Sequence, residues 1–171
     1  MIEVITGDIT DLEVQAIVCP AHKHLLRGQG VSEAIFDKAG PALVLACSEI
    51  GKCPVGEARI TEGYRLPTSF ILHTVTPQWS GGDQWGSSAL EQLKNCYENV
   101  LKLALEHNIS ELVFPALGAG SNKIPHMLVA QLAFKILSAY SDQFDRIVVC
   151  LYDTAICKLW ERALVDYQSS N

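Results

Sequence analysis

Two short glycine-rich segments have the composition of loops that bind phosphate. Gly28-Gln29-Gly30-Val31 follows one apolar run of the chain, and Gly118-Ala119-Gly120-Ser121-Asn122 follows another. Glycine lets backbone N–H groups approach a phosphate without a Cβ in the way, and a helix N-terminus behind such a loop adds a positive dipole. Two such loops can clamp two phosphates from opposite sides, whereas one loop alone is also the ordinary pattern of a turn.

A carboxylate and an aromatic ring directly follow the first and the last apolar runs. Asp8, in Thr6-Gly7-Asp8-Ile9-Thr10, can accept a hydrogen bond from an amino group such as that of adenine, and its alternative interpretation is a turn or a helix cap. Tyr152 can offer a flat face to a base at the same sheet edge as Asp8. Its alternative interpretation is an ordinary tyrosine of the core or the rim.

Short apolar runs predict the strands that would position these residues. The runs are nearly continuous, which indicates strands that are covered on both faces. The predicted strands are Ile2–Thr6, Ala16–Val18, Phe70–Val75, Leu112–Phe114 and Ile147–Leu151, with Ala58–Thr61 as a weaker, alternating candidate.

Apolar residues that recur at intervals of three and four predict the helices. A capping box of Ser88 and Glu91 marks the start of one helix, Asp153 is a candidate N-cap of another, and Gly40-Pro41 ends the first. The alternation of strands and helices predicts an α/β fold. The predicted helices are Val31–Ala39, Ser88–His107, His126–Tyr140 and Thr154–Leu164.

The composition is that of a folded, anionic protein. Of the 171 residues 49% are hydrophobic, and 13 Lys+Arg against 19 Asp+Glu leave a net charge of −6. This balance excludes intrinsic disorder, and the lack of a basic stripe argues against nucleic-acid binding. The start has no signal-peptide pattern, no run is long enough for a membrane helix, and the six cysteines form no C-x2-C pair. We therefore expect one domain over residues 1–171, cytoplasmic and independent of membranes.

Several segments occur in a characteristic order along essentially the whole chain. They are Gly7-Asp8-Ile9-Thr10, Gln15-Ala16-Ile17-Val18, Gly28-Gln29-Gly30-Val31 with Ala34-Ile35, Ala39-Gly40-Pro41, Cys53-Pro54-Val55-Gly56-Glu57-Ala58, Ile71-Leu72-His73-Thr74-Val75, and Phe114-Pro115-Ala116-Leu117-Gly118-Ala119-Gly120. In this order they resemble the macro domain family, the module that binds ADP-ribose. The resemblance implies a three-layer α-β-α sandwich with a mixed central sheet.

The resemblance also implies a role for each matching position. Asp8 is similar to the acceptor of the adenine amino group, with the Ile9 amide beside it, and Tyr152 to the aromatic residue that covers adenine. The two glycine loops are similar to those that hold the diphosphate, and the second also reaches the distal ribose. The implied ligand-binding residues are Asp8, Ile9, Ala21, His22, Gly28, Gln29, Gly30, Val31, Ser32, Gly118, Ala119, Gly120, Ser121, Asn122 and Tyr152.

The segment after the second predicted strand departs from the hydrolytic members of the family. Many of them carry Asn-Ala-Ala-Asn where this chain has Cys19-Pro20-Ala21-His22, and an Asp where it has Ser32. Neither Ser32 nor Gln29 can orient or deprotonate a water as a carboxylate does. The usual hydrolase pair is therefore missing, and binding of ADP-ribose as a reader or sensor is the primary hypothesis.

His22 is the candidate catalytic residue if the chain is an enzyme. Its imidazole can act as a general base near neutral pH, contact a ribose hydroxyl, or be an exposed loop histidine. Cys19, His22 and His24 are residue types that bind zinc, and they lie within six residues of one another. No second cluster in the sequence completes a tetrahedral zinc site. We expect neither a metal nor a cofactor.

Two further functions stay open beside binding. One is hydrolysis, either removal of mono-ADP-ribose or deacetylation of O-acetyl-ADP-ribose, and the other is binding of a different nucleotide-derived signal. Lys123 beside Asn122 can favour an anionic group on the distal ribose, or can serve solubility alone. The expected partner is ADP-ribose or an ADP-ribosylated protein, and the expected oligomeric state is a monomer.

Overall fold

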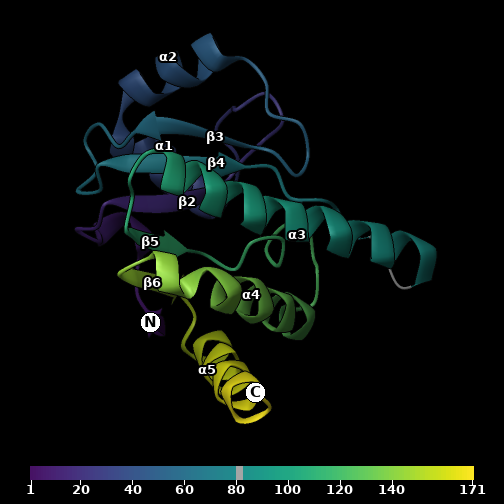
Figure 1. The fold of residues 1–171 in the computed structure, drawn as a ribbon. Coiled ribbons are helices and arrows are strands. Elements are labelled where there is room, and N and C mark those ends of the chain that lie inside the picture. The colour runs from purple at the N-terminus through teal and green to yellow at the C-terminus, as the bar shows by residue number, and fades with distance from the viewer. Residues whose placement is uncertain (80–82) are drawn as a thin grey trace.

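A mixed sheet forms the middle layer of the molecule (Figure 1). The computed structural model describes residues 1–79 and 83–171, and the side chains of all of these except 83–87. The strands follow the order β1-β6-β5-β2-β4-β3, and β3 alone among them runs antiparallel to its neighbour. The strands of the described residues are β1 (Ile2–Thr6), β2 (Ala16–Pro20), β3 (Ala58–Glu62), β4 (Phe70–Thr74), β5 (Glu111–Phe114) and β6 (Arg146–Leu151).

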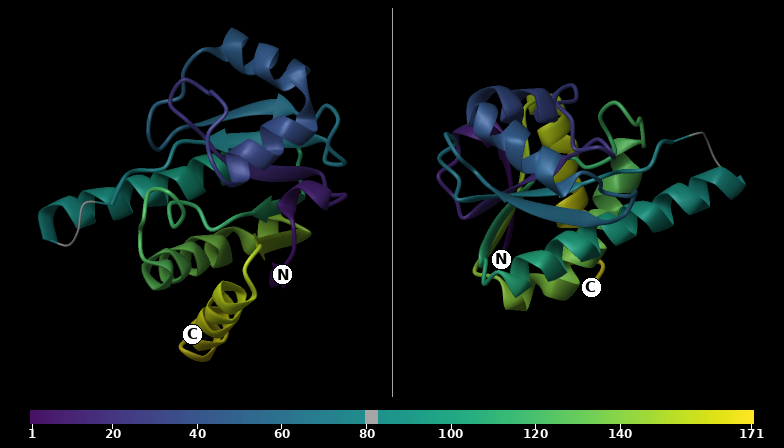
Figure 2. Two further views of the ribbon diagram at one scale, coloured as in Figure 1. Left: turned by 180° about the vertical axis from the view of Figure 1, so that it is seen from behind. Right: turned by 90° about the horizontal axis from the view of Figure 1, so that it is seen from above.

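Helices cover both faces of the sheet, which Figure 2 shows from behind and from above. The first two helices pack on one face, and the three later ones on the other. This arrangement confirms the predicted three-layer α-β-α sandwich. The helices are α1 (Val31–Ala39), α2 (Pro41–Ile50), α3 (Asp83–Glu106), α4 (His126–Tyr140) and α5 (Thr154–Ser169), with short 3-10 helices η1 (Ile9–Asp11) and η2 (Ser141–Gln143).

Each face of the sheet has its own hydrophobic core. Along β2, Ala16 and Val18 pack with residues of α3, α4 and α5, whereas Ile17 and Cys19 pack with residues of α1 and α2. All four side chains are fully buried. Because both faces of β2 are covered, its residues are apolar at successive positions.

The structure differs from the predicted elements at three helices. Gly40 does end α1, but its φ of 87° turns the chain and Pro41 then begins α2, which the sequence analysis did not predict. Proline suits the first turn of a helix because it lacks an N–H that would have no partner there. The helix α3 begins at Asp83 rather than at Ser88, and α5 continues to Ser169 rather than ending at Leu164.

The parallel strands bring their carboxyl ends to one edge of the sheet. The segments that follow β1, β2, β4, β5 and β6 all emerge there, because these five strands point the same way. In open α/β sheets this is the edge at which ligands bind. No described helix is long and apolar enough to cross a membrane.

Candidate functional site

The first part of the site is the carboxylate of Asp8, directly after β1. Its Oδ1 accepts hydrogen bonds from the Thr10 backbone N at 2.9 Å and from Thr10 Oγ1 at 2.6 Å, which makes Asp8 the N-cap of η1. Its Oδ2 accepts from Lys38 Nζ at 3.2 Å. The bond from the Thr10 side chain is the main cause that lowers the pKa of Asp8, and the Lys38 ammonium adds to it. Asp8 is thus an ionised acceptor at neutral pH.

Tyr152 is exposed directly after β6, the strand that pairs with β1. It follows β6, whose Leu151 pairs with Thr6 of β1, and the Gly7 N–H donates to the Leu151 carbonyl at 2.9 Å. The Tyr152 side chain is 85% exposed although it directly follows a buried strand. A carboxylate and an exposed tyrosine therefore follow two paired strands at the β1–β6 end of the edge.

The first glycine loop leads into the N-terminus of α1. Gly30 has a φ of 63°, a conformation that glycine adopts without strain, and no side chain caps the helix that begins at Val31. Ser32 is only 2% exposed, and its Oγ accepts the Gly28 N–H at 3.0 Å. The first turn of α1 therefore has N–H groups that no side chain caps, a type of group that can bind an anion.

The second glycine loop connects β5 to α4. Gly118 has a φ of 80°, and a Cβ at this position would lie 2.8 Å from Ile124 Cδ1. The Ile124 N–H donates to the Gly118 carbonyl at 2.9 Å, and the Lys123 N–H to the Gly120 carbonyl at 3.1 Å. The loop is therefore a closed turn that only glycine fits at position 118.

Asn122 joins this second loop to the segment after β4. Its Nδ2 donates to Thr76 Oγ1 at 2.6 Å and to the Thr76 carbonyl at 3.0 Å, and its own carbonyl accepts the Trp79 N–H at 2.9 Å. The sequence analysis assigned Asn122 to the distal ribose and did not single out Thr76. A signal for Thr76 was present, because it follows a strand that ends at the same edge.

His22 lies exposed in the loop after β2. Its Nδ1 accepts the His24 N–H at 3.0 Å, and its carbonyl accepts the Leu25 N–H at 2.7 Å. A neutral imidazole whose Nδ1 accepts a hydrogen bond carries its proton on Nε2. The ring therefore offers a donor to its surroundings, while the nitrogen that could act as a base is already engaged.

Cys19 lies at the end of β2 and is fully buried. Burial raises the pKa of its thiol to about 12, so Cys19 is neither a thiolate nucleophile nor a ready metal ligand at neutral pH. Within the described part of the chain, no group of three or more His, Cys, Asp or Glu side chains is arranged to hold a metal ion.

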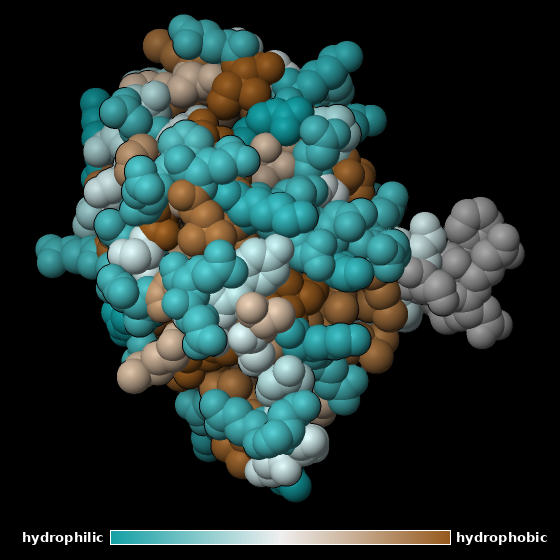
Figure 3. Space-filling model, in the orientation of Figure 1, coloured by the Kyte–Doolittle hydropathy of each residue, from teal (hydrophilic) through white to brown (hydrophobic). Residues whose placement is uncertain are grey.

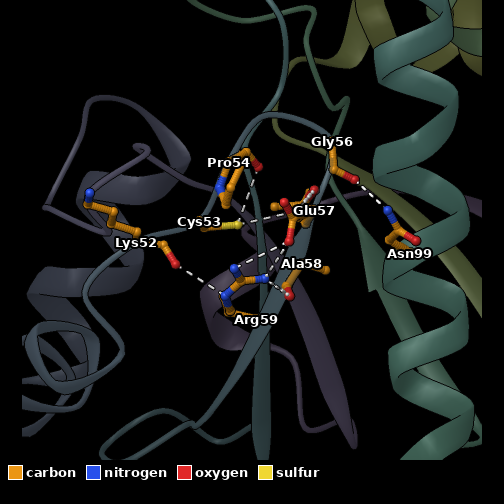
Figure 4. Close-up of polar contacts among 9 residues, drawn as sticks. Lys52, Cys53, Pro54, Gly56, Glu57, Ala58, Arg59 and Asn99 are labelled. Carbon is orange, nitrogen blue, oxygen red and sulfur yellow. Dashed lines mark hydrogen bonds and ion pairs between the residues drawn. The ribbon is translucent and has the colours of Figure 1, made fainter.

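The segment between α2 and β3 is held by Arg59 and by Asn99 of α3 (Figure 4), and it contacts the loop that carries His22. The Cys53 N–H donates to the Lys23 carbonyl at 2.8 Å. Asn99 of α3 donates from Nδ2 to the Gly56 carbonyl at 2.7 Å, and Arg59 Nε donates to the Lys52 carbonyl at 3.1 Å. Contacts from α3 and β3 thus hold the segment against which the loop rests.

Two grooves lie away from this edge. One, of about 510 Å³, runs between α3 and α4, and another, of about 420 Å³, lies between α2 and β3. Neither is lined by the glycine loops, Asp8 or Tyr152. Figure 3 shows one face of the molecule, which is largely hydrophilic with hydrophobic residues in separate groups. These two grooves are therefore separate from the glycine loops, Asp8 and Tyr152.

Comparison with known proteins gives one consistent result. The family model described as "Macro domain" matches residues 18–133. A macro domain-containing protein of Chlorobaculum tepidum is 40% identical, over 96% of this chain and 95% of that one. A protein of Klebsiella pneumoniae named O-acetyl-ADP-ribose deacetylase is 38% identical, over 96% and 97%.

Solved structures match in the same way. The macrodomain of Oceanobacillus iheyensis with ADP superposes with a TM-score of 0.91 at 32% identity, over 98% of this chain and 92% of that one. The Trypanosoma brucei macrodomain in complex with ADP-ribose has a TM-score of 0.85 at 30% identity, over 95% of this chain and 68% of that one.

Proposed function

Because the chain belongs to the macro domain family, we propose that it binds ADP-ribose, free or attached to a protein, at the carboxyl edge of its sheet. The observation that carries this proposal is that Asp8 and the exposed Tyr152 follow two paired strands, at one end of an edge that also holds two glycine loops. From β1 to β2 this edge spans about 14 Å at the usual strand spacing, which suits an elongated ligand.

The edge supplies one group of contacts for each part of such a ligand. We assign the base to Tyr152, Asp8 and the Ile9 amide. The diphosphate lies between Gly28–Val31, where α1 begins, and Gly118–Ser121. The distal ribose points toward Ala21, His22 and Asn122. This assignment follows the strand order, in which β6 and β5 separate β1 from β2.

Hydrolysis of an ADP-ribose derivative is the second candidate function. It is favoured by the name of the Klebsiella pneumoniae relative, which is an O-acetyl-ADP-ribose deacetylase. Against it stand the replaced carboxylate position, Ser32, and the His22 Nδ1 that already accepts the His24 N–H. In this candidate His22 would have to turn away from His24 before it could take a proton from water.

A paired assay separates the two functions. Displacement of a fluorescent ADP-ribose analogue measures binding, and release of ADP-ribose from mono-ADP-ribosylated protein or of acetate from O-acetyl-ADP-ribose measures turnover. We expect displacement without release. Release that disappears in His22→Ala would establish the hydrolase instead, and failure of ADP-ribose to displace the analogue would refute the proposal.

The cytoplasm is the compartment in which we propose that the protein acts. All six cysteines are free and buried, as expected for a protein that folds under reducing conditions. The proposed partner is ADP-ribose or an ADP-ribosylated protein. We propose that the protein acts as a monomer and binds neither nucleic acid nor membranes.

A further inference from the structure

The base end of the site contains a hydrogen-bond donor as well as an acceptor. Lys38, in the last turn of α1, reaches η1 and places its Nζ 3.2 Å from Asp8 Oδ2 and 3.1 Å from Asp11 Oδ1. Nothing in the sequence indicated this contact, because 30 residues separate Lys38 from Asp8. The Lys38 ammonium therefore contacts Oδ2, the carboxylate oxygen of Asp8 that Thr10 leaves free.

The two groups differ in how freely they can move. Thr10 holds Asp8 through two hydrogen bonds to Oδ1, so the direction of Oδ2 is fixed. The Lys38 side chain is 45% exposed and that of Asp8 33% exposed. Exposed ion pairs are weak, and lysine has a flexible stem of four carbons. A ligand can therefore displace the Lys38 ammonium without breaking the two hydrogen bonds from Thr10 that hold the Asp8 carboxylate.

We propose that Lys38 widens the base specificity of this site, so that it accepts 6-oxopurine nucleotides, with a hypoxanthine-type base, as well as 6-aminopurine nucleotides. The inference rests on the proposed function, since it concerns the base of the same ligand. Its basis is the juxtaposition of a fixed acceptor, a movable donor and the open ring of Tyr152.

Each class of base finds a complementary pair of groups here. The amino group of adenine donates to Asp8 Oδ2 and its N1 accepts from the Ile9 amide assigned above, so adenine needs no bond from Lys38. In a 6-oxopurine the polarity of both positions is reversed: the O6 accepts from Lys38 Nζ and the N1–H donates to Asp8 Oδ2. An acceptor alone would face the O6 with a carboxylate, which leaves both groups unpaired and repels the ligand.

The experiment compares ADP-ribose with inosine diphosphate ribose by calorimetry on the full chain. These probes differ only in the base. We expect wild-type dissociation constants within about tenfold of each other, and we expect Lys38→Ala to widen their ratio by a further tenfold or so, the usual effect of one charged hydrogen bond. Lys38→Arg keeps a donor and should restore the wild-type ratio. Lys135→Ala, at an exposed position on α4, is the control for the loss of one positive charge.

The possible failures are distinct. If ADP-ribose binds and the inosine compound does not, or if Lys38→Ala leaves the ratio of the two constants unchanged, the role of Lys38 is refuted and the proposed function stands. If neither compound binds the wild-type protein, the proposed function itself fails. Thermal unfolding of each variant confirms that the exposed substitution leaves the fold intact.

Discussion

Asp8 uses its two carboxylate oxygens for different tasks. Oδ1 accepts from the N–H and the hydroxyl of Thr10, which fixes the turn after β1, while Oδ2 accepts, among the described residues, only from the ammonium of Lys38 at 3.2 Å. The bond from the Thr10 hydroxyl keeps the pKa of Asp8 below its ordinary value. The residue therefore combines a structural anchor with a charged acceptor that a ligand can reach.

Tyr152 gives the first prediction at the scale of single residues. Because its side chain is 85% exposed, Tyr152→Ala should leave the melting temperature nearly unchanged. Loss of the stacking face should weaken ADP-ribose binding by roughly tenfold or more, as base stacking on aromatic residues does elsewhere. Tyr152→Phe keeps the ring and should bind like the wild type. Equal affinity of the alanine and phenylalanine variants in calorimetry would contradict a stacking role.

Ser32 gives the second prediction. Ser32→Ala leaves the part-buried Gly28 N–H without the acceptor that lies 3.0 Å away on the almost fully buried Ser32. We expect a loss of about 1–2 kcal/mol in the free energy of unfolding and weaker binding of ADP-ribose. Urea denaturation and calorimetry measure the two effects. Ser48→Ala, at an exposed position on α2, is the control and should change neither.

The positions of Asp8 and Tyr152 could be predicted because each directly follows an apolar strand that ends at the carboxyl edge of the sheet. The contact of Lys38 could not be predicted, because it depends on how α1 packs beside η1 and leaves no local pattern in the sequence. Thr76 directly follows a strand that ends at this edge, but its bond to Asn122 depends on how two loops meet. The roles of the ligand-binding residues themselves stay predictions.

The joined loops after β4 and β5 carry the third prediction, at the scale of elements. Asn122→Ala removes both hydrogen bonds to Thr76 and should free the second glycine loop. Amide hydrogen exchange of residues 118–124 should become faster, and ADP-ribose affinity should fall by about tenfold. Thr76→Val should produce a smaller change of the same kind. Unchanged exchange in Asn122→Ala would show that the loop keeps its conformation without this bond.

The pairing of β3 with β4 carries the fourth prediction, which concerns pH. His73 is fully buried; its Nε2 lies 2.9 Å from Thr61 Oγ1, and no partner for its Nδ1 occurs among the described residues. Burial lowers the pKa of His73 to about 4, against 6.5 in the unfolded chain. The native state therefore binds fewer protons than the unfolded state between these values.

It follows that the stability contributed by neutral His73 is complete above pH 6.5 and is lost as the pH falls toward 4. The loss should approach about 3 kcal/mol, since each pKa unit corresponds to roughly 1.4 kcal/mol. Urea denaturation across this range should show a smaller pH dependence in His73→Gln than in wild type. The exposed His24→Gln serves as control, and an equal slope in both variants would contradict the role of His73.

The strands were easier to predict than the helix ends. Both faces of β2 are covered, so its apolar run marks it directly. Gly40-Pro41 ends one helix and begins another, because a glycine with positive φ can end a helix and a proline can begin the next. The pattern of Ser88 and Glu91 resembles a cap, yet both residues lie inside α3.

At the scale of the whole molecule, a protein of net charge −6 has to bind an anionic ligand. Local partial charges resolve this conflict. Backbone amides at the start of α1 and in the loop before α4 offer partial positive charge, and the strand order places them beside the base end at β1 and β6. The fold therefore confines the site to one edge.

The most direct test is an NMR titration of the uniformly labelled protein with ADP-ribose, followed through its amide resonances. We expect saturable shifts concentrated in residues 7–10, 21–32, 118–124 and 152, with little change in the groove between α3 and α4. Shifts centred on that groove, or no saturable shift at all, would contradict the proposal that the carboxyl edge of the sheet is an ADP-ribose site.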